Sequence, residues 1–112
     1  MAVRLSKPWQ PLTAENVGKL TSHLGVYQLA LDDDTIVYIG VAGGRSTFGL
    51  KGEVSAHLDD PAGGGTHFRT EINMSYRSRH LELLQVHVHD HGTVPVGNTD
   101  IDPATLGRMR PD

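Results

Sequence analysis

Two tyrosines, Tyr27 and Tyr38, lie in apolar runs that three aspartates at positions 32–34 separate. Runs rich in Val, Ile, Leu and Tyr around such a stretch predict a β-hairpin. With a two-residue turn, Tyr27 lies opposite Gly40 and Leu29 opposite Tyr38, so both phenols share one face. A four-residue turn preserves this arrangement, whereas a three-residue turn or a bulge breaks it. Two adjacent phenols could take part in proton transfer, although a free tyrosine titrates near pH ~10 and needs a cation or metal-bound hydroxide to act as a base. The alternative is two half-buried packing residues.

The tyrosines stand in two short motifs, Gly25-Val26-Tyr27 and Tyr38-Ile39-Gly40. This pair resembles the motifs of the GIY-YIG endonuclease superfamily, with Val26 in place of the usual Ile. That family also has a histidine on the helix after the second motif, a glutamate opening a later helix and an asparagine after a proline. The matching residues here, in the same order, are His57, Glu82 and Asn98. The resemblance covers roughly residues 25 to 98.

The resemblance implies metal-dependent phosphodiester hydrolysis of DNA or RNA. Glu82 would bind a single Mg²⁺ or Mn²⁺, because an ion held by one carboxylate keeps much of its hydration shell. His57, whose unperturbed pKa is near neutral, would accept a proton, while Tyr27 and Tyr38 would line the pocket. Asn98 would hold the site together through hydrogen bonds. These five residues are therefore the predicted catalytic residues, expected in one pocket.

One position departs from the family's pattern, because Glu53 stands where the catalytic arginine is expected, four residues before His57. A phosphoryl transition state spreads negative charge over several oxygens, so a carboxylate in place of a cation opposes catalysis. Glu53 could instead be a second metal ligand, or another side chain could supply the cation. The candidate substrate-binding residues are Arg45, Lys51 and Arg69, although Lys51 lies about 200° around the predicted helix from Glu53 and does not simply replace the arginine.

Two alternatives to a nuclease stay open. The first is a catalytically inactive module of the same fold that binds nucleic acid or a protein partner. The second, unrelated to the family, is a plain interaction domain in which the tyrosines only pack.

Composition limits the partner only weakly. The chain has 112 residues, a formal net charge of −3 and no cysteine. We expect a single domain over residues 1–112, with an extended N-terminal arm at 1–12 and a tail at 99–112. Because net negative charge gives no general attraction to nucleic acid, a nucleic-acid site must be a local patch. The sequence carries no recognisable signal peptide and no membrane-length apolar run, so we expect no membrane partner and a cytoplasmic location.

The remaining segments predict a small α/β (α+β) domain, with a three-stranded, mainly antiparallel sheet flanked by helices. Helices are expected from Thr13 to about Ser22, over Leu50–Leu58, and from Ser78 to about His91. The third strand is expected over Thr66–Met74, where apolar and polar residues alternate. If the sheet is ordered as in the resembled family, the polar face of this strand brings Arg69 beside the tyrosines.

Three other groups could have a chemical role. The Gly43–Thr47 segment could offer backbone N–H groups and Arg45 to an anion, but it matches no phosphate-loop motif, so a flexible surface loop is preferred. Arg77, Arg79 and His80 form a basic run that could contact a phosphate backbone or be a solvated turn. His87 and His91 have a spacing that can bind zinc, but no third ligand follows at a recognisable spacing, so exposed histidines are preferred for the His87, His89 and His91 group.

Overall fold

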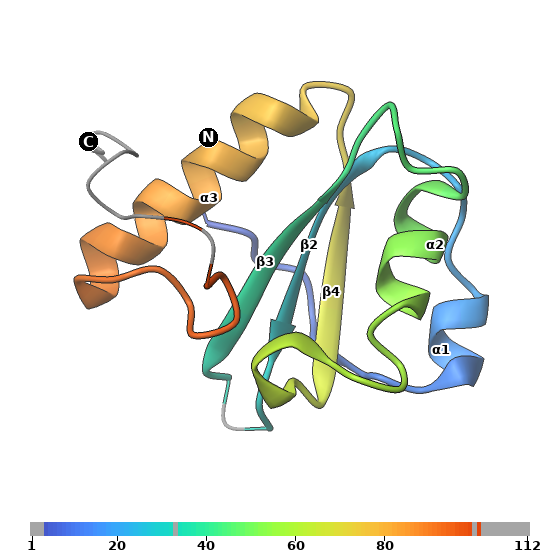
Figure 1. Ribbon diagram of the computed structural model, residues 1–112, viewed down its shortest axis with the longest axis horizontal. Coiled ribbons are helices and arrows are strands. Elements are labelled where there is room, and N and C mark those ends of the chain that lie inside the picture. The colour runs from blue at the N-terminus through green and yellow to red at the C-terminus, as the bar shows by residue number, and fades with distance from the viewer. Residues whose placement is uncertain (1–3, 33, 100, 102–112) are drawn as a thin grey trace.

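A computed structural model describes residues 4–32, 34–99 and 101 of the chain (Figure 1). Within these residues an antiparallel sheet has the strand order β1-β4-β2-β3. The strands are β1 (Gln10–Pro11), β2 (Gly25–Ala30), β3 (Ile36–Ala42) and β4 (His67–Ile72). The helices are α1 (Ala14–Gly18), α2 (Gly49–Ser55) and α3 (Tyr76–His91), with a short 3₁₀ turn at Ala62–Gly64.

The predicted α+β class is confirmed, but the predicted number of strands is wrong. Two residues of the N-terminal arm pair with β4, Gln10 with Phe68 and Pro11 with His67, and thereby add a fourth strand. Proline is tolerated there because β1 is at the edge of the sheet. Most of the predicted tail at 99–112 lies outside the described residues.

The central hairpin has the predicted register at the tyrosines but not the predicted turn. The Leu31 amide donates a hydrogen bond to the Thr35 carbonyl, and the Leu31 carbonyl accepts one from the Asp34 amide. Three positions, 32–34, therefore separate this pair, in place of the predicted two. Ala30 then pairs with Ile36, and Val37 is the extra residue of a β-bulge. Each of these features alone would move the phenols to opposite faces, but together the two shifts cancel. The pairs Tyr27–Gly40 and Leu29–Tyr38 form as predicted.

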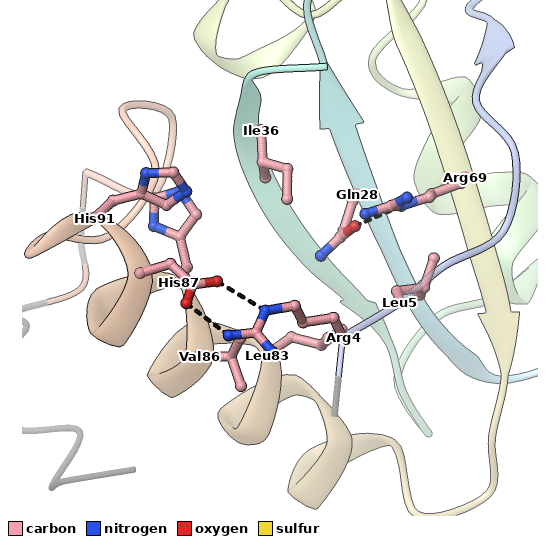
Figure 2. A pocket seen from close by; sticks show the side chains of 10 residues that line it. Arg4, Leu5, Gln28, Ile36, Arg69, Leu83, Val86, His87 and His91 are labelled. Carbon is pink, nitrogen blue, oxygen red and sulfur yellow. Dashed lines mark hydrogen bonds and ion pairs between the residues drawn. The ribbon is translucent and has the colours of Figure 1, made fainter. Parts of the chain in front are cut away.

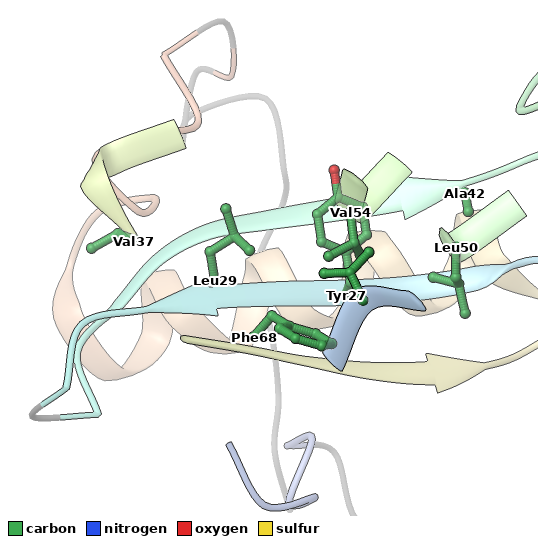
Figure 3. Packing of buried hydrophobic residues seen from close by; sticks show 8 residues of the cluster. Tyr27, Leu29, Val37, Ala42, Leu50, Val54 and Phe68 are labelled. Atoms are coloured by element: carbon green, nitrogen blue, oxygen red, sulfur yellow. The ribbon is translucent and has the colours of Figure 1, made fainter. Parts of the chain in front are cut away.

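Helices cover both faces of the sheet (Figure 1). Helices α1 and α2 pack on the face that carries Tyr27, and α3 packs on the opposite face. The cluster under α1 and α2 contains Val17, Tyr27, Leu29, Val37, Ala42, Leu50, Val54 and Phe68 (Figure 3). The cluster under α3 contains Leu5, Val26, Ile39, Leu83, Leu84 and Val94. Because successive strand residues point to opposite faces, the position of a residue along its strand decides which helices it can meet.

Two glycines of the hairpin motifs are required by close packing. A Cβ atom at Gly40 would lie 2.1 Å from Cζ of Tyr27, whose ring crosses the strand at this point. A Cβ atom at Gly25 would lie 2.0 Å from the carbonyl oxygen of Glu71. A densely packed interior cannot absorb contacts this short without moving the ring or the strand. The glycines therefore let β2 and its tyrosine pack tightly against both neighbouring strands.

The helix boundaries differ from the prediction in ways that affect the site. Helix α1 ends at Gly18 rather than near residue 22, although Thr13 caps it as expected by accepting a hydrogen bond of 3.2 Å from the Asn16 amide. Helix α2 ends at Ser55, so His57 lies in the turn that follows it. Helix α3 begins two residues early, at Tyr76. No helix in the described ranges is long and apolar enough to cross a membrane.

Candidate functional site

Three of the five predicted catalytic residues meet on the α2 face of the sheet. The ring centroids of Tyr27 and Tyr38 are 5.9 Å apart, and those of His57 lie 5.6 Å from Tyr27 and 5.1 Å from Tyr38. The Tyr27 hydroxyl and His57 Nε2 are hydrogen-bonded at 2.9 Å. The hairpin register aligns the phenols, and the turn after α2 brings the imidazole to them.

The hydrogen bonds of His57 fix where its proton lies. The backbone N–H of Ala62 donates to His57 Nδ1 at 3.3 Å, so Nδ1 must carry a lone pair. The proton of the neutral ring is then on Nε2, which donates to the Tyr27 oxygen. Burial lowers the pKa of His57, and the charges of Glu53 and Asp60 oppose this only in part. His57 is therefore a neutral hydrogen-bond donor, and protonating it would cost the bond from Ala62.

Tyr27 is placed as a buried anchor rather than as a base. Only 1% of its surface is exposed. Burial raises the pKa of the Tyr27 hydroxyl, and the nearby Tyr38 and Glu53 raise it further. A phenol with a raised pKa keeps its proton at neutral pH. In the folded protein, Tyr27 accepts from His57 and ties β2 to the turn after α2.

Glu53, the residue in place of the expected arginine, faces the loop after β3. Its carboxylate accepts a hydrogen bond of 2.9 Å from the Ser46 hydroxyl, and the Ser46 oxygen accepts one of 3.1 Å from the Gly43 amide. The described residues contain no group of three or more His, Cys, Asp or Glu that could hold a metal ion, and the alternative role of Glu53 as a second metal ligand stays a prediction. Glu53 thus fastens the loop to α2.

Glu82 lies on the other side of the sheet from the phenols. Its carboxylate pairs with Arg79, which also pairs with Glu71 at 2.8 Å. Glu71 is opposite Val26 in the register and shares its face, the face that α3 covers. Although burial opposes ionisation of Glu71, hydrogen bonds from Arg79 and Asn73 lower its pKa. The structure therefore does not bring Glu82 into one pocket with the phenols, because α3 packs on the face opposite α2.

This placement also bears on the predicted metal. A cation at Glu82 would have to compete with the guanidinium of Arg79, which already pairs with this carboxylate and with that of Glu71. The residues around Glu82 do not form a prepared cation site, and Mg²⁺ or Mn²⁺ binding stays a prediction.

Asn98 completes the outer edge of β3. The residue is 3% exposed, and its side chain bonds to both backbone groups of Ile39. Asn98 Oδ1 accepts from the Ile39 amide at 3.0 Å, and Nδ2 donates to the Ile39 carbonyl at 2.9 Å. The backbone of the same segment also bonds to β3, because the Gly97 amide donates to the Val37 carbonyl at 2.7 Å. Asn98 does form the predicted hydrogen bonds, but its partner is strand backbone, so it protects a sheet edge.

The three predicted substrate-binding residues lie in three different places. The prediction that Arg69 stands beside the tyrosines is wrong, because the register puts Thr70 opposite Tyr27 and turns Arg69 to the α3 face. There, Arg69 Nε donates to Gln28 Oε1 at 2.7 Å. Lys51 is exposed on α2. Arg45 lines a separate hollow.

This hollow, which we call the basic hollow, lies between the loop after β3 and the first turns of α3 and has a volume of about 360 Å³. It contains two exposed arginines, Arg45 and Arg77. No carboxylate lines it, and among the described residues neither arginine forms an ion pair. The lining residues are Val41, Gly43, Gly44, Arg45, Ser46, Tyr76, Arg77 and His80.

Hydrogen bonds hold the loop of the basic hollow in place. Ser46 donates its amide proton to the Gly43 carbonyl at 2.9 Å, and the Gly44 amide donates to the Tyr76 hydroxyl at 3.1 Å. The disfavoured alternative, in which this loop offers free backbone N–H groups to an anion, does not fit the structure at Gly43 and Gly44, because both amides bond within the protein. The anion-binding groups of the hollow are side chains, held on an ordered loop and a helix.

The late histidines differ in burial. His87 is buried and bonds to the Thr93 carbonyl at 2.7 Å, so the expectation that it is exposed is wrong. His91 lies next to it with a ring distance of 4.5 Å, and His89 is exposed. No third metal ligand joins this pair in the described part of the chain.

Fold and site together define a small antiparallel α+β domain with an internal Tyr–Tyr–His cluster and a basic hollow beside α3. The chain belongs to a family described as a domain of unknown function, DUF7508, whose family model matches residues 3–90. This match includes the hairpin and the basic hollow and ends before Asn98. A comparison with curated proteins found no match.

Proposed function

We propose that the chain is a GIY-YIG-like module that binds nucleic acid through the basic hollow and does not cleave it. One observation carries the proposal: Arg45 and Arg77 face one hollow that has no acidic lining residue. In a chain with a formal net charge of −3, such a patch is the local site that phosphate binding requires.

The geometry of the hollow suits a phosphodiester. Its volume of about 360 Å³ lies within the ordinary range of ligand pockets and leaves room for a phosphate and its sugar. Arg77 is in the first turn of α3, a 16-residue helix whose positive dipole end faces the same region. A guanidinium can contact two phosphate oxygens at once, which favours arginine over lysine here.

Binding without cleavage follows from the other predicted residues. Tyr27 is buried and keeps its proton, and His57 donates to it. Glu82 is paired with Arg79 on the other side of the sheet. Glu53 supplies negative charge where a transition state needs positive charge. None of these groups lines the basic hollow.

Fluorescence anisotropy with short labelled DNA and RNA, single-stranded and duplex, tests this proposal. We expect Kd values of about 10⁻⁶ to 10⁻⁴ M that weaken steeply between about 50 and 200 mM salt. The double variant Arg45→Gln/Arg77→Gln should bind at least tenfold more weakly and have a salt slope smaller by about 1 per arginine lost. The matched control is Lys7→Gln/Lys19→Gln, which removes the same charge from exposed positions outside the hollow.

The possible results of this experiment are distinct. Equal losses in the two double variants would mean that net charge, and not the hollow, determines binding. No binding by the unmodified chain at low salt would overturn the proposal and favour a protein partner.

Hydrolysis is the second candidate, favoured by the meeting of both phenols and His57 on one face, as the family resemblance implies. Incubation of plasmid and RNA with Mg²⁺ or Mn²⁺ tests it, with Glu82→Ala and Tyr38→Phe as controls. Metal-dependent cleavage that both substitutions abolish would support this candidate against binding alone. Cleavage that neither substitution affects would exclude these residues as its site.

A further inference from the structure

A second cavity lies at the other end of α3, under the N-terminal arm (Figure 2). Its volume is about 150 Å³, and we call it the arm cavity. Leu5 of the arm and Leu83 and Val86 of α3 form apolar walls. A cavity of about this size can hold one benzene-sized ring. The other walls are polar or charged and are formed by Arg4, Gln28, Arg69, His87, Asp90 and His91.

Gln28 provides a buried donor to the arm cavity. The residue is 3% exposed, and its Oε1 accepts from Arg69 Nε at 2.7 Å. Because a guanidinium can only donate, this bond fixes the orientation of the amide. Gln28 Nε2 therefore points into the cavity (Figure 2). Because no buried polar side-chain atom in the described residues lacks a partner, Nε2 is not fully enclosed, and a ligand in the cavity can reach it.

Among the described residues, one cation beside the arm cavity forms no ion pair, although the charge of Asp34 acts on it from a longer distance. Arg4 is paired with Asp90 through bonds of 2.9 and 2.6 Å. Arg69 forms no ion pair with any described residue; it donates to Gln28 and to the Lys7 carbonyl, and its guanidinium stacks on Trp9 at 4.0 Å. A positive charge and an amide donor beside apolar walls select for a small anion with an apolar body.

We propose that the arm cavity binds a small monocarboxylate of about the size of benzoate. The carboxylate accepts from Gln28 Nε2 and lies beside the Arg69 guanidinium, and the apolar body packs against Leu5 and Leu83. The arm closes the cavity, because Leu5 is buried and the Arg4–Asp90 pair fastens the arm to α3. This site is independent of the proposed nucleic-acid site, which lies at the first turns of the same helix.

Titration of the full chain with sodium benzoate, followed by NMR of the side-chain NH₂ and backbone amide signals, tests the proposal. We expect saturable shifts of the Gln28 NH₂ signals, with a Kd on the order of 1 mM for so small a ligand. Benzyl alcohol, which has a similar size and no charge, should bind at least tenfold more weakly. Absence of saturable shifts at Gln28, or equal binding of the alcohol, would overturn the proposal.

Two substitutions locate the binding. Gln28→Glu keeps a partner for Arg69 but removes the amide donors and the uncompensated charge, so benzoate affinity should fall about tenfold to a hundredfold. Arg77→Gln in the basic hollow is the control and should leave benzoate affinity unchanged. If Gln28→Glu fails to fold, Arg69→Lys serves instead, because it keeps the charge and loses the fixed guanidinium geometry, and it should weaken binding. Unchanged affinity in the folded variant would refute the site.

Discussion

Replacing Asn98 with aspartate should destabilise the fold in a pH-dependent way. At neutral pH, the new carboxylate still accepts from the Ile39 amide, but its second oxygen faces the Ile39 carbonyl, which only accepts. The lost hydrogen bond costs about 1 kcal/mol, since His80 still bonds to the same carbonyl at 3.1 Å. Burying a charge at a position only 3% exposed adds about 2 kcal/mol or more. We therefore expect a loss of about 3 kcal/mol at pH 7.

The sign of the pH dependence follows from the protonated form. A protonated aspartate at position 98 can donate to Ile39, so folding raises the pKa of the new carboxyl above its unfolded value of about 3.9. The variant is then nearest to the original stability below pH ~4 and loses stability as the pH rises through the folded pKa. Urea unfolding of both proteins between pH 4 and 7 measures the difference.

A control variant separates the two parts of this prediction. Asn98→Ala removes both hydrogen bonds without adding a charge and should cost about 2 kcal/mol at every pH, because the Ile39 amide loses its partner. A loss for Asn98→Asp that does not change with pH, or no loss at pH 7, would refute the assignment of Asn98 to the edge of β3.

Two other predictions concern packing and protonation. Gly40→Ala should cost about 1–3 kcal/mol in urea unfolding, because the added Cβ lies 2.1 Å from Cζ of Tyr27 and the ring must move; an unchanged midpoint would contradict this packing. Burial lowers the pKa of both His57 and His87, so the unfolded chain takes up protons first as the pH falls below about 6.5. The Tm should therefore fall between pH 7 and pH 5, and a constant Tm over this interval would mean that the two rings titrate in the folded protein as they do in the unfolded chain.

The hairpin could be predicted from the sequence because its signals are local. Two apolar runs on either side of an acidic turn predict the hairpin, and the alternation of side chains along each strand predicts that Tyr27 and Tyr38 share one face. The turn itself could not be predicted, since a three-residue loop and a bulge at Val37 give the same register as a two-residue turn.

The wider site depends on which face each helix covers, and sequence periodicity does not determine that. The apolar residues on one side of α3 predict a half-buried helix. They do not indicate that this helix packs on the face of the sheet opposite α2. Glu82 therefore lies away from the phenols although the resemblance predicts it beside them. Arg69 differs from its prediction for another reason, because the register between β2 and β4 turns it to the α3 face. The sequence indicates both basic parts of the hollow, Arg45 in the loop and Arg77 at the start of the helix. Only the fold brings these two arginines to the same hollow.

The central claim, binding of nucleic acid at the basic hollow, is tested most directly by mapping amide NMR shifts of the full chain during titration with a short oligonucleotide. We predict that the largest shifts fall on the Gly43–Ser46 loop and on residues 76–80 at the start of α3, and that they disappear at high salt. Shifts centred instead on Tyr38 and His57, or no shifts at all at low salt, would contradict the account.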